Sequence, residues 1–268
     1  MDILTVLGFA SALVIGISLG LIGGGGSILT VPILVYLLGV EASEYAPAYS
    51  LFIVGATSLV GSTQKYREGL VDMRTFLVFG IPSIITVYFT RHSLVPAIPD
   101  EIALGDYMLS KRLLIMGLFA VLMVLASFSM MKGKKKCDDG DEEQKTQKFN
   151  YPLILVEGLV VGTLTGLVGA GGGFLIIPAL VKFSGLSMKK AVGTSLLIIA
   201  AKSLFGFIGD ATRLDIEWPM LLGLTALAIG GIFFGNRLSR KIPGYKLERA
   251  FGIFVLVMGV AILFTELS

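Results

Sequence analysis

The sequence predicts an all-α polytopic membrane protein built from two inverted repeats, and three observations lead to that prediction. First, 54% of the 268 residues are hydrophobic and only 15% are charged, whereas soluble domains carry about 25% charged residues. Second, the apolar residues form blocks of about 20, the length that a helix needs to cross a hydrocarbon layer. Third, the second half of the chain repeats a pattern of the first. Because the blocks lack the alternation of barrel strands, we expect helices.

Hydropathy and helix breakers divide the chain into ten predicted helical pieces. Two of these, 27–39 and 173–184, reach only about 20 Å at about 1.5 Å per residue. Each follows a run of glycines, so both are predicted to be half-helices. Each repeat is therefore a hairpin of a glycine-broken helix and a half-helix, followed by three transmembrane helices. The other eight pieces are 3–22, 46–64, 73–91, 110–131, 152–169, 189–209, 217–236 and 247–266.

Internal repetition is visible once the sequence is shifted against itself. At an offset of 146, residues 16–39 fall on 162–185 with 11 identities in 24 positions. After one inserted residue the offset becomes 145, and residues 46–61 fall on 191–206. In that segment Ser50 recurs as Ser195, for example. The two halves are therefore predicted to share one structural unit.

The charged residues divide and orient the repeats. The chain is predicted to consist of a first membrane repeat, 1–131, a charged cytoplasmic linker, 132–150, and a second repeat, 151–268. An odd number of crossings in each repeat inverts the second relative to the first. Most basic loops then share one face, which the positive-inside rule makes cytoplasmic. We expect a multi-pass membrane protein with both termini outside; Arg91, Lys111 and Arg112 are exceptions on the outer face.

The two glycine-rich breaks are the predicted substrate-binding elements. They lie at 20–27 and 166–173, each just before a half-helix. The first amides of such a helix have no intrahelical acceptor, and together with the helix dipole they attract anions. Two sites related by inverted symmetry would meet near the midplane of the membrane. The alternative is that the glycines only pack helices closely, as Gly16 and Gly20 would. The candidate glycines are Gly23, Gly24, Gly25, Gly26, Gly169, Gly171, Gly172 and Gly173.

These paired motifs resemble those of the sulfite exporter TauE/SafE family, also known as the toluene-sulfonate uptake permeases. The resemblance rests on 16–32 and 162–178, on the Ala-x-x-Thr-Ser-Leu element at 191–196 with its weaker partner at 46–51, and on the central polar loop. It implies a carrier of the bacterial inner membrane for sulfite, thiosulfate, sulfoacetate, other sulfonates or other small anions. The resemblance further implies that an ion gradient drives transport, with a proton or sodium as the coupling ion. The first half departs from the pattern, because Tyr49 stands where the second half has Thr194.

Among the polar side chains at membrane depth, Lys202 is the first candidate for substrate binding. It lies about two thirds of the way along the predicted helix 189–209, where an ionisable group is costly unless it faces a cavity or a partner. A small anionic substrate would be such a partner; the alternative is a lysine that extends to the outer interface. Asp210 is interpreted as a loop charge. The candidate hydroxyls, which otherwise would bond carbonyls of their own helices, are Ser27, Thr30, Ser50, Thr194 and Ser195.

The same residues argue against an enzyme. A serine nucleophile at 27 would need a base, and the single histidine, His92, falls in or beside an external loop. His, Cys and acidic residues do not cluster, so neither a metal site nor a cofactor is predicted. The predicted partners are a small anion, the lipid bilayer and a coupling ion, with no nucleic acid; a homodimer is one open oligomeric state. A passive anion channel and a carrier of small carboxylates remain as alternatives.

Overall fold

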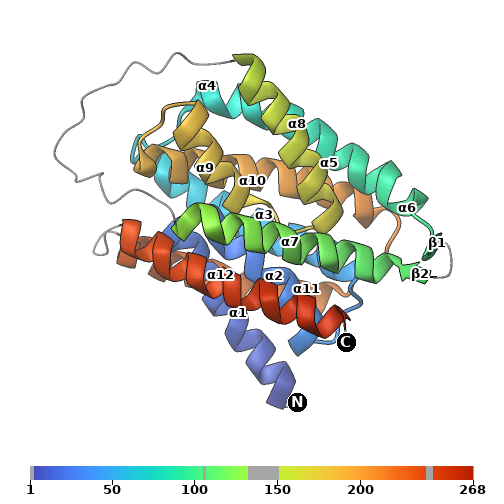
Figure 1. The fold of residues 1–268 in the computed structure, drawn as a ribbon. Coiled ribbons are helices and arrows are strands. Elements are labelled where there is room, and N and C mark those ends of the chain that lie inside the picture. The colour runs from blue at the N-terminus through green and yellow to red at the C-terminus, as the bar shows by residue number, and fades with distance from the viewer. Residues whose placement is uncertain (1–2, 105–106, 132–150, 240–243, 268) are drawn as a thin grey trace.

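The structure is a computed structural model, and it describes residues 3–104, 107–131, 151–239 and 244–267. All ten predicted helical pieces are helical in these ranges. The predicted linker 132–150 lies outside the described residues. The chain is thus an all-helical bundle apart from one short hairpin, and Figure 1 shows its long helices packed side by side.

The first half of the chain contains three long uninterrupted helices and two composite ones. The uninterrupted helices are α1 Ile3–Ile22, α3 Tyr45–Arg67 and α7 Lys111–Met131. The composite helix after α1 consists of η1 Gly24–Leu29, α2 Thr30–Pro32 and η2 Ile33–Leu37. The composite helix after α3 consists of α4 Met73–Thr75, η3 Phe76–Gly80, α5 Ile81–Phe89, η4 Thr90–Leu94 and α6 Val95–Ala97.

The second half contains five helices that follow the predicted pieces closely. They are α8 Tyr151–Val168, α9 Gly173–Phe183, α10 Met188–Ala211, α11 Trp218–Ser239 and α12 Gly244–Leu267. Both short helices end in the same way: Gly39 and Gly185 adopt positive φ angles of 66° and 65°. The next amide then bonds back six residues, from Val40 to Leu34 O and from Leu186 to Leu180 O, which is the Schellman arrangement that stops a helix.

The segment 92–109 differs from the external loop that the sequence predicts. The helix that begins at Met73 continues to Ala97 through two π-turns, η3 and η4. Each π-turn precedes a helical turn that carries a proline near its start, where a missing N–H donor is tolerated. A hairpin of β1 Glu101–Leu104 and β2 Tyr107–Ser110 follows. Local propensity did not reveal this hairpin, because its strands are only four residues long.

The helices of the two halves pair reciprocally. The helix α1 lies along α11, and its counterpart α8 lies along α5. The pairs α3 with α10 and α7 with α12 join equivalent helices of the two halves. Figure 1 shows α7 and α12 next to each other on one side of the bundle. The helix α10 is the most enclosed of the long apolar helices, with 67% of its apolar window buried.

Glycines make the reciprocal packing possible. A Cβ on Gly16 would overlap the backbone of Ala228 in α11, and a Cβ on Gly162 would meet Ser83 in α5. Gly20 and Gly166 repeat the same contacts one turn further along. Because the backbones touch, any side chain at these positions would separate the helices. The packing interpretation of these glycines, spaced by four residues, is therefore confirmed.

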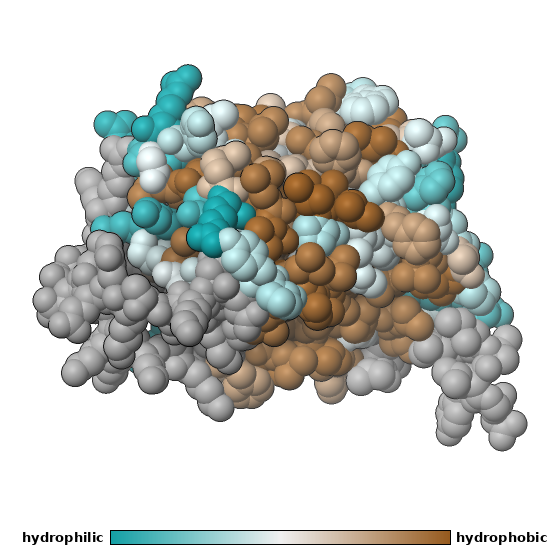
Figure 2. All heavy atoms as spheres, turned by 90° about the horizontal axis from the view of Figure 1, so that it is seen from above, coloured by the Kyte–Doolittle hydropathy of each residue, from teal (hydrophilic) through white to brown (hydrophobic). Residues whose placement is uncertain are grey.

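The surface is that of a membrane protein. Among the described residues, four helices are long and apolar enough to cross a bilayer: Met73–Ala97, Tyr151–Val168, Met188–Ala211 and Trp218–Ser239. Large apolar side chains such as Phe234 and Leu125 are 68% and 61% exposed. In Figure 2, hydrophobic side chains dominate the middle of the face shown, and hydrophilic ones gather toward its two ends. Such an apolar belt between polar ends fits a bilayer.

Candidate functional site

The two glycine breaks cross in the centre of the bundle and touch. A Cβ on Gly24 would overlap the backbone of Gly173, and the reverse is equally true. Gly171 lies beside Ser27, with 3.1 Å from its hypothetical Cβ to the serine Cβ. Positive φ angles of 76° at Gly23 and 73° at Gly169 turn the chain out of α1 and α8 at matched positions. Only glycine tolerates both these angles and this backbone approach.

The breaks also meet the central helices α3 and α10. A Cβ on Gly23 would lie 2.9 Å from the Val192 side chain and 3.2 Å from Ser195 Oγ. A Cβ on Gly169 would overlap Pro47, the counterpart of Val192. In this conformation the two breaks are closed against each other and against α3 and α10. The anion pocket between them therefore stays a prediction that requires the breaks to separate.

Lys202 is fully buried next to the second break. Its Nζ donates a 3.0 Å hydrogen bond to Thr165 Oγ1 in α8, and it lies 2.9 Å from where a Cβ on Gly172 would be. Its side chain is 0% exposed, so the ammonium does not extend to an interface. Among the described residues it has no acidic partner. A buried cation with one neutral partner is electrostatically incomplete.

The candidate hydroxyls divide into engaged and unpaired ones. Ser27 Oγ donates to Gly24 O at 2.7 Å, within the first break, and Ser195 Oγ donates to Val192 O at 2.9 Å, within its own helix. Thr30 Oγ1 and Ser50 Oγ are buried, and neither has a hydrogen-bond partner among the described residues. Gly25 and Gly26 belong to the η1 turn, and a Cβ on Gly26 would press on the backbone of α1.

Thr194 and Tyr49 explain the departure from the family pattern that the sequence shows. Thr194 Oγ1 accepts a 2.9 Å hydrogen bond from the backbone N–H of Asp72, just before α4. Tyr49 Oη accepts a 2.9 Å bond from the backbone N–H of Glu217, just before α11. Asp72 and Glu217 are themselves 145 residues apart. The two different side chains thus perform the same structural task at matched positions.

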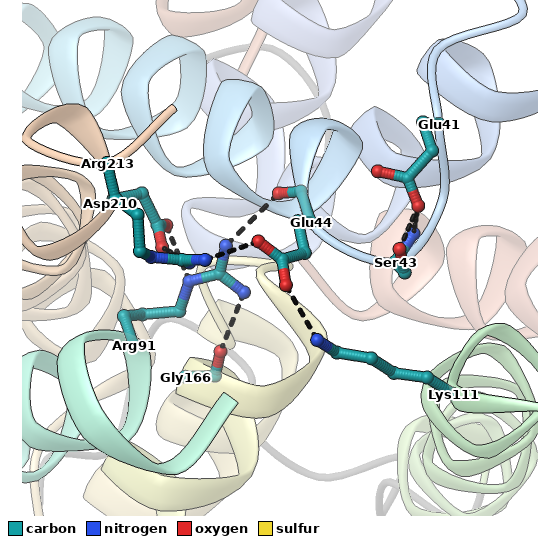
Figure 3. Close-up of polar contacts among 8 residues, drawn as sticks. All are labelled: Glu41, Ser43, Glu44, Arg91, Lys111, Gly166, Asp210 and Arg213. Carbon is teal, nitrogen blue, oxygen red and sulfur yellow. Dashed lines mark hydrogen bonds and ion pairs between the residues drawn. The ribbon is translucent and has the colours of Figure 1, made fainter. Parts of the chain in front are cut away.

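A cluster of five charged side chains, which the sequence analysis missed, lies at one end of α3 and α10. Figure 3 shows Arg91 and Asp210 pointing toward each other, with Arg213, Glu44 and Lys111 around them. The distance from Arg91 Nε to Asp210 Oδ2 is 2.6 Å, and both side chains are 0% exposed. The interpretation of Asp210 as a loop charge is wrong, because the residue lies in the last turn of α10 and faces inward.

The remaining contacts of this charged cluster join five segments of the chain. Arg91 also donates to the carbonyls of Gly166, at 3.4 Å, and Glu44, at 3.2 Å. The Glu44 carboxylate accepts from Lys111 Nζ at 2.6 Å and from Arg213 Nη1 at 2.5 Å. Burial raises the pKa of Glu44, whereas the hydrogen bonds and charges of Lys111 and Arg213 lower it. The lowering outweighs the effect of burial, so the pKa of Glu44 lies below the ordinary 4.5.

One sequence signal could have revealed the charged cluster. Arg91 and Lys111 were exceptions to the predicted distribution of basic residues, which is what buried or paired cations would produce. Their acidic partners come from residues 44 and 210, and only the fold brings these close. Among the described residues, no group of three or more His, Cys, Asp and Glu side chains could hold a metal ion.

The chain is similar to a family model and to several membrane proteins. A family model described as sulfite exporter TauE/SafE matches residues 8–262. A probable membrane transporter protein of Xylella fastidiosa (strain 9a5c) is 26% identical over 251 residues, which cover 93% of this chain and 91% of the relative. The probable membrane transporter protein YdhB of Bacillus subtilis is 26% identical over 250 residues, covering 93% of this chain and 96% of YdhB.

A third relative aligns with a larger share of this chain. The probable membrane transporter protein MJ0441 of Methanocaldococcus jannaschii is 26% identical over 276 residues, covering 98% of this chain and 95% of that protein. No solved structure matches the chain. The relatives are named as membrane transporters, and none of these names specifies a substrate.

Proposed function

This chain belongs to the sulfite exporter TauE/SafE family, and from that membership we propose that it is a secondary transporter of a small anion. The proposed substrate is a sulfur oxyanion or an organosulfonate, of the sulfite, thiosulfate and sulfoacetate class. The proposed location is the inner membrane, with both termini outside. The names of the relatives support membrane transport in general, and the substrate class is our inference from the family and the site.

The observation that carries the proposal is the environment of Lys202. A charged side chain deep in a membrane protein needs a counter-charge or water. The Lys202 ammonium has one neutral hydroxyl, Thr165 Oγ1, and no acid within the described residues. A small anion at the second glycine break would complete this site, and the glycine backbone would let the anion approach closely.

Alternating access would supply the movement that the closed breaks require. The proposal is that the two halves are inverted repeats that rock against each other around the Gly24–Gly173 contact. Reciprocal helix packing supports a two-fold relation between the halves. The touching glycine backbones then represent a closed state, and separation of the breaks would open the site to one face at a time.

A thermal-shift panel on purified protein tests the substrate proposal. The panel contains sulfite, thiosulfate, sulfoacetate, sulfate and small carboxylates. We expect one sulfur anion to raise the melting temperature of the wild type. In Lys202→Met the rise in melting temperature at the same anion concentration should be at least about tenfold smaller, because the charge pair between the lysine and the anion is lost. The matched control is Lys190→Met, an exposed lysine on the same helix, which should keep the wild-type shift.

Two results would contradict this proposal. Stabilisation by carboxylates alone would show that the substrate is a carboxylate and not a sulfur anion. An unchanged anion-induced rise in the melting temperature of Lys202→Met would show that Lys202 does not belong to the site. Uptake into proteoliposomes distinguishes a carrier from a passive channel. We expect accumulation against a gradient that an ionophore abolishes, whereas a channel would only equilibrate the anion.

A further inference from the structure

Two fully buried cations lie at the two ends of the second glycine break, 166–173. Near its end, Lys202 Nζ is 2.9 Å from the position that a Cβ on Gly172 would occupy. At its start, Arg91 Nη1 donates a 3.4 Å hydrogen bond to the carbonyl of Gly166. Both cationic residues are 0% exposed. The break therefore has a positive charge enclosed by protein next to each of its ends.

A closed ring of contacts joins these two cations. Arg91 Nε binds Asp210 Oδ2 at 2.6 Å, and its Nη1 binds the Gly166 carbonyl. Thr165, the residue before Gly166, accepts the 3.0 Å hydrogen bond from Lys202 Nζ. Lys202 and Asp210 both belong to α10, where eight residues separate them by about 12 Å. A displacement of Arg91 therefore changes the contacts of the helical turn that also holds Lys202.

The charges of the two cations are compensated differently. Lys202 has the neutral Thr165 hydroxyl as its partner. Arg91 has Asp210, which among the described residues is the one acidic side chain that is fully buried. A guanidinium offers the same planar set of donors to a carboxylate and to an oxyanion. An oxyanion that enters the second break would therefore compete with Asp210 for Arg91.

The sum of the charges shows what this competition requires. Two cations, Lys202 and Arg91, and one carboxylate, Asp210, carry a net charge of +1 when all three are ionised. A monoanion bound to both cations would lower the sum to zero and would leave the Asp210 carboxylate without its arginine. A buried carboxylate without a partner is costly, and a proton removes its charge. Uptake of one proton would therefore restore the original charge of the site.

The other ionisable groups near Asp210 lie toward the exposed side of the charged cluster. Arg213 Nη2 is 3.4 Å from Asp210 Oδ1, and the Arg213 side chain is 32% exposed. The Glu44 side chain, just before α3, is 19% exposed and binds both Arg213 and Lys111 of α7. His92 of η4 is exposed as well. These partly exposed groups give solvent protons access to the end of α10 that carries Asp210.

On the basis of the anion transport proposed above, we propose that Arg91 is the second anion-binding cation of the site, and that it exchanges Asp210 for the anion while Asp210 takes up a proton. Arg91 Nε leaves Asp210 Oδ2, the guanidinium and Lys202 Nζ bind the anion, and the freed carboxylate accepts one proton from solvent. Anion and proton bind together, so each raises the affinity of the protein for the other. Asp210 is then the site of the coupling proton.

Proton uptake during anion binding tests this exchange on the purified protein. Thiosulfate and sulfoacetate are the probes, because both are fully ionised near neutral pH and take up no proton themselves. In weakly buffered detergent solution with a pH indicator, we expect the wild type to take up about one proton per bound anion. Because the proton binds together with the anion, the Kd should fall about tenfold for each unit by which the pH is lowered.

Substitutions separate the roles of the two residues. Asp210→Asn cannot accept the proton and leaves Arg91 available, so it should bind the anion without proton uptake and with a Kd that does not change with pH. Arg91→Gln should raise the Kd at least about tenfold. Arg91→Lys should recover part of this loss, because it keeps the charge but not the planar set of donors. The control is His92→Gln, at the exposed histidine next to Arg91 in the chain, which should behave as the wild type.

Three results would overturn the exchange: anion binding to the wild type without proton uptake, proton uptake retained in Asp210→Asn, and an unchanged Kd in Arg91→Gln. If Asp210→Asn does not elute as a monodisperse protein, the pH dependence of the Kd in the wild type and in His92→Gln decides, since a Kd independent of pH contradicts the exchange. Failure of the transport proposal looks different. In that case no anion of the thermal-shift panel binds the wild type, and the exchange falls with it.

Discussion

Lys202 and Thr165 form the smallest unit that links the fold to the proposed chemistry. Thr165 Oγ1 accepts the bond from Lys202 Nζ and can donate to Gly162 O at 3.3 Å in its own helix. The threonine thus holds the ammonium toward the second break. The repeat counterparts of these two residues, Thr57 and Leu19, carry no charge. The proposed anion site is therefore confined to one of the two breaks.

Thr165→Val removes the oxygen but keeps the shape of the side chain. The buried ammonium then has no acceptor, so we expect the melting temperature to fall by about 2–6 °C. A bound anion becomes the sole partner of Lys202, and the thermal shift that it produces should exceed that of the wild type. Melting curves with and without the stabilising anion measure both effects.

Thr165→Ser is the control for this variant, because it retains the hydroxyl and should keep the wild-type melting temperature and shift. An anion-induced shift in Thr165→Val no larger than that of the wild type would show that Thr165 does not position Lys202.

At the scale of elements, two matched hydrogen bonds fix where α4 and α11 begin. Each joins a hydroxyl of a central helix to the last backbone amide before a helix of the other half: Thr194 with Asp72, and Tyr49 with Glu217. Asp72 adds an N-cap, since its carboxylate accepts a 2.6 Å bond from the Thr75 amide. These contacts give Thr194 a structural role in this conformation.

Tyr49→Phe and Thr194→Val each remove one of these acceptors. We expect each variant to lower the free energy of unfolding by about 1 kcal/mol, and the double variant to lower it by about the sum, because the sites lie far apart. Denaturant titration in mixed micelles measures the change. Tyr66→Phe is the control, since Tyr66 is 62% exposed. If the double variant loses an amount of unfolding free energy clearly different from the sum of the two single losses, the hydrogen bonds of Tyr49 and Thr194 are coupled.

At the scale of the whole molecule, helices at matched positions of the two halves pack reciprocally, and the charge pattern predicts how the molecule lies in the membrane. The offset of 145 that aligns α3 with α10 also relates the contact points of α5 and α11: Gly162 meets Ser83 in α5, and Gly16 meets Ala228 in α11. The charged cluster then belongs to the face that the sequence predicts to be external.

The predicted orientation is testable with cleavable tags on spheroplasts, in which the outer membrane is open and the inner membrane is intact. Protease added outside should remove tags from both termini and leave a tag inserted in the linker 132–150 intact, because an odd number of crossings separates the linker from each end. Permeabilised cells are the control, in which all three tags should be cleaved. Cleavage of only one terminal tag in spheroplasts with an intact inner membrane would exclude the inverted arrangement.

The sequence by itself determined the helical class, the ten helical pieces and the close packing at Gly16, Gly20, Gly162 and Gly166. Hydrophobic length and the glycine spacing are local properties, so they can be read along the chain. The sequence also identified Lys202 as a side chain at membrane depth. Its role in binding an anion stays a prediction.

Only the tertiary structure decided which polar groups meet. Residues 44, 91, 111, 210 and 213 form one cluster although as many as 169 positions separate them in the chain. Pairwise contacts at such separations depend on how helices cross, and no local pattern encodes that crossing. The same holds for the hydrogen bonds of Tyr49 and Thr194 and for the direct contact of Gly24 with Gly173. Burial strengthens these interactions, because charges and amides in a low dielectric must find partners.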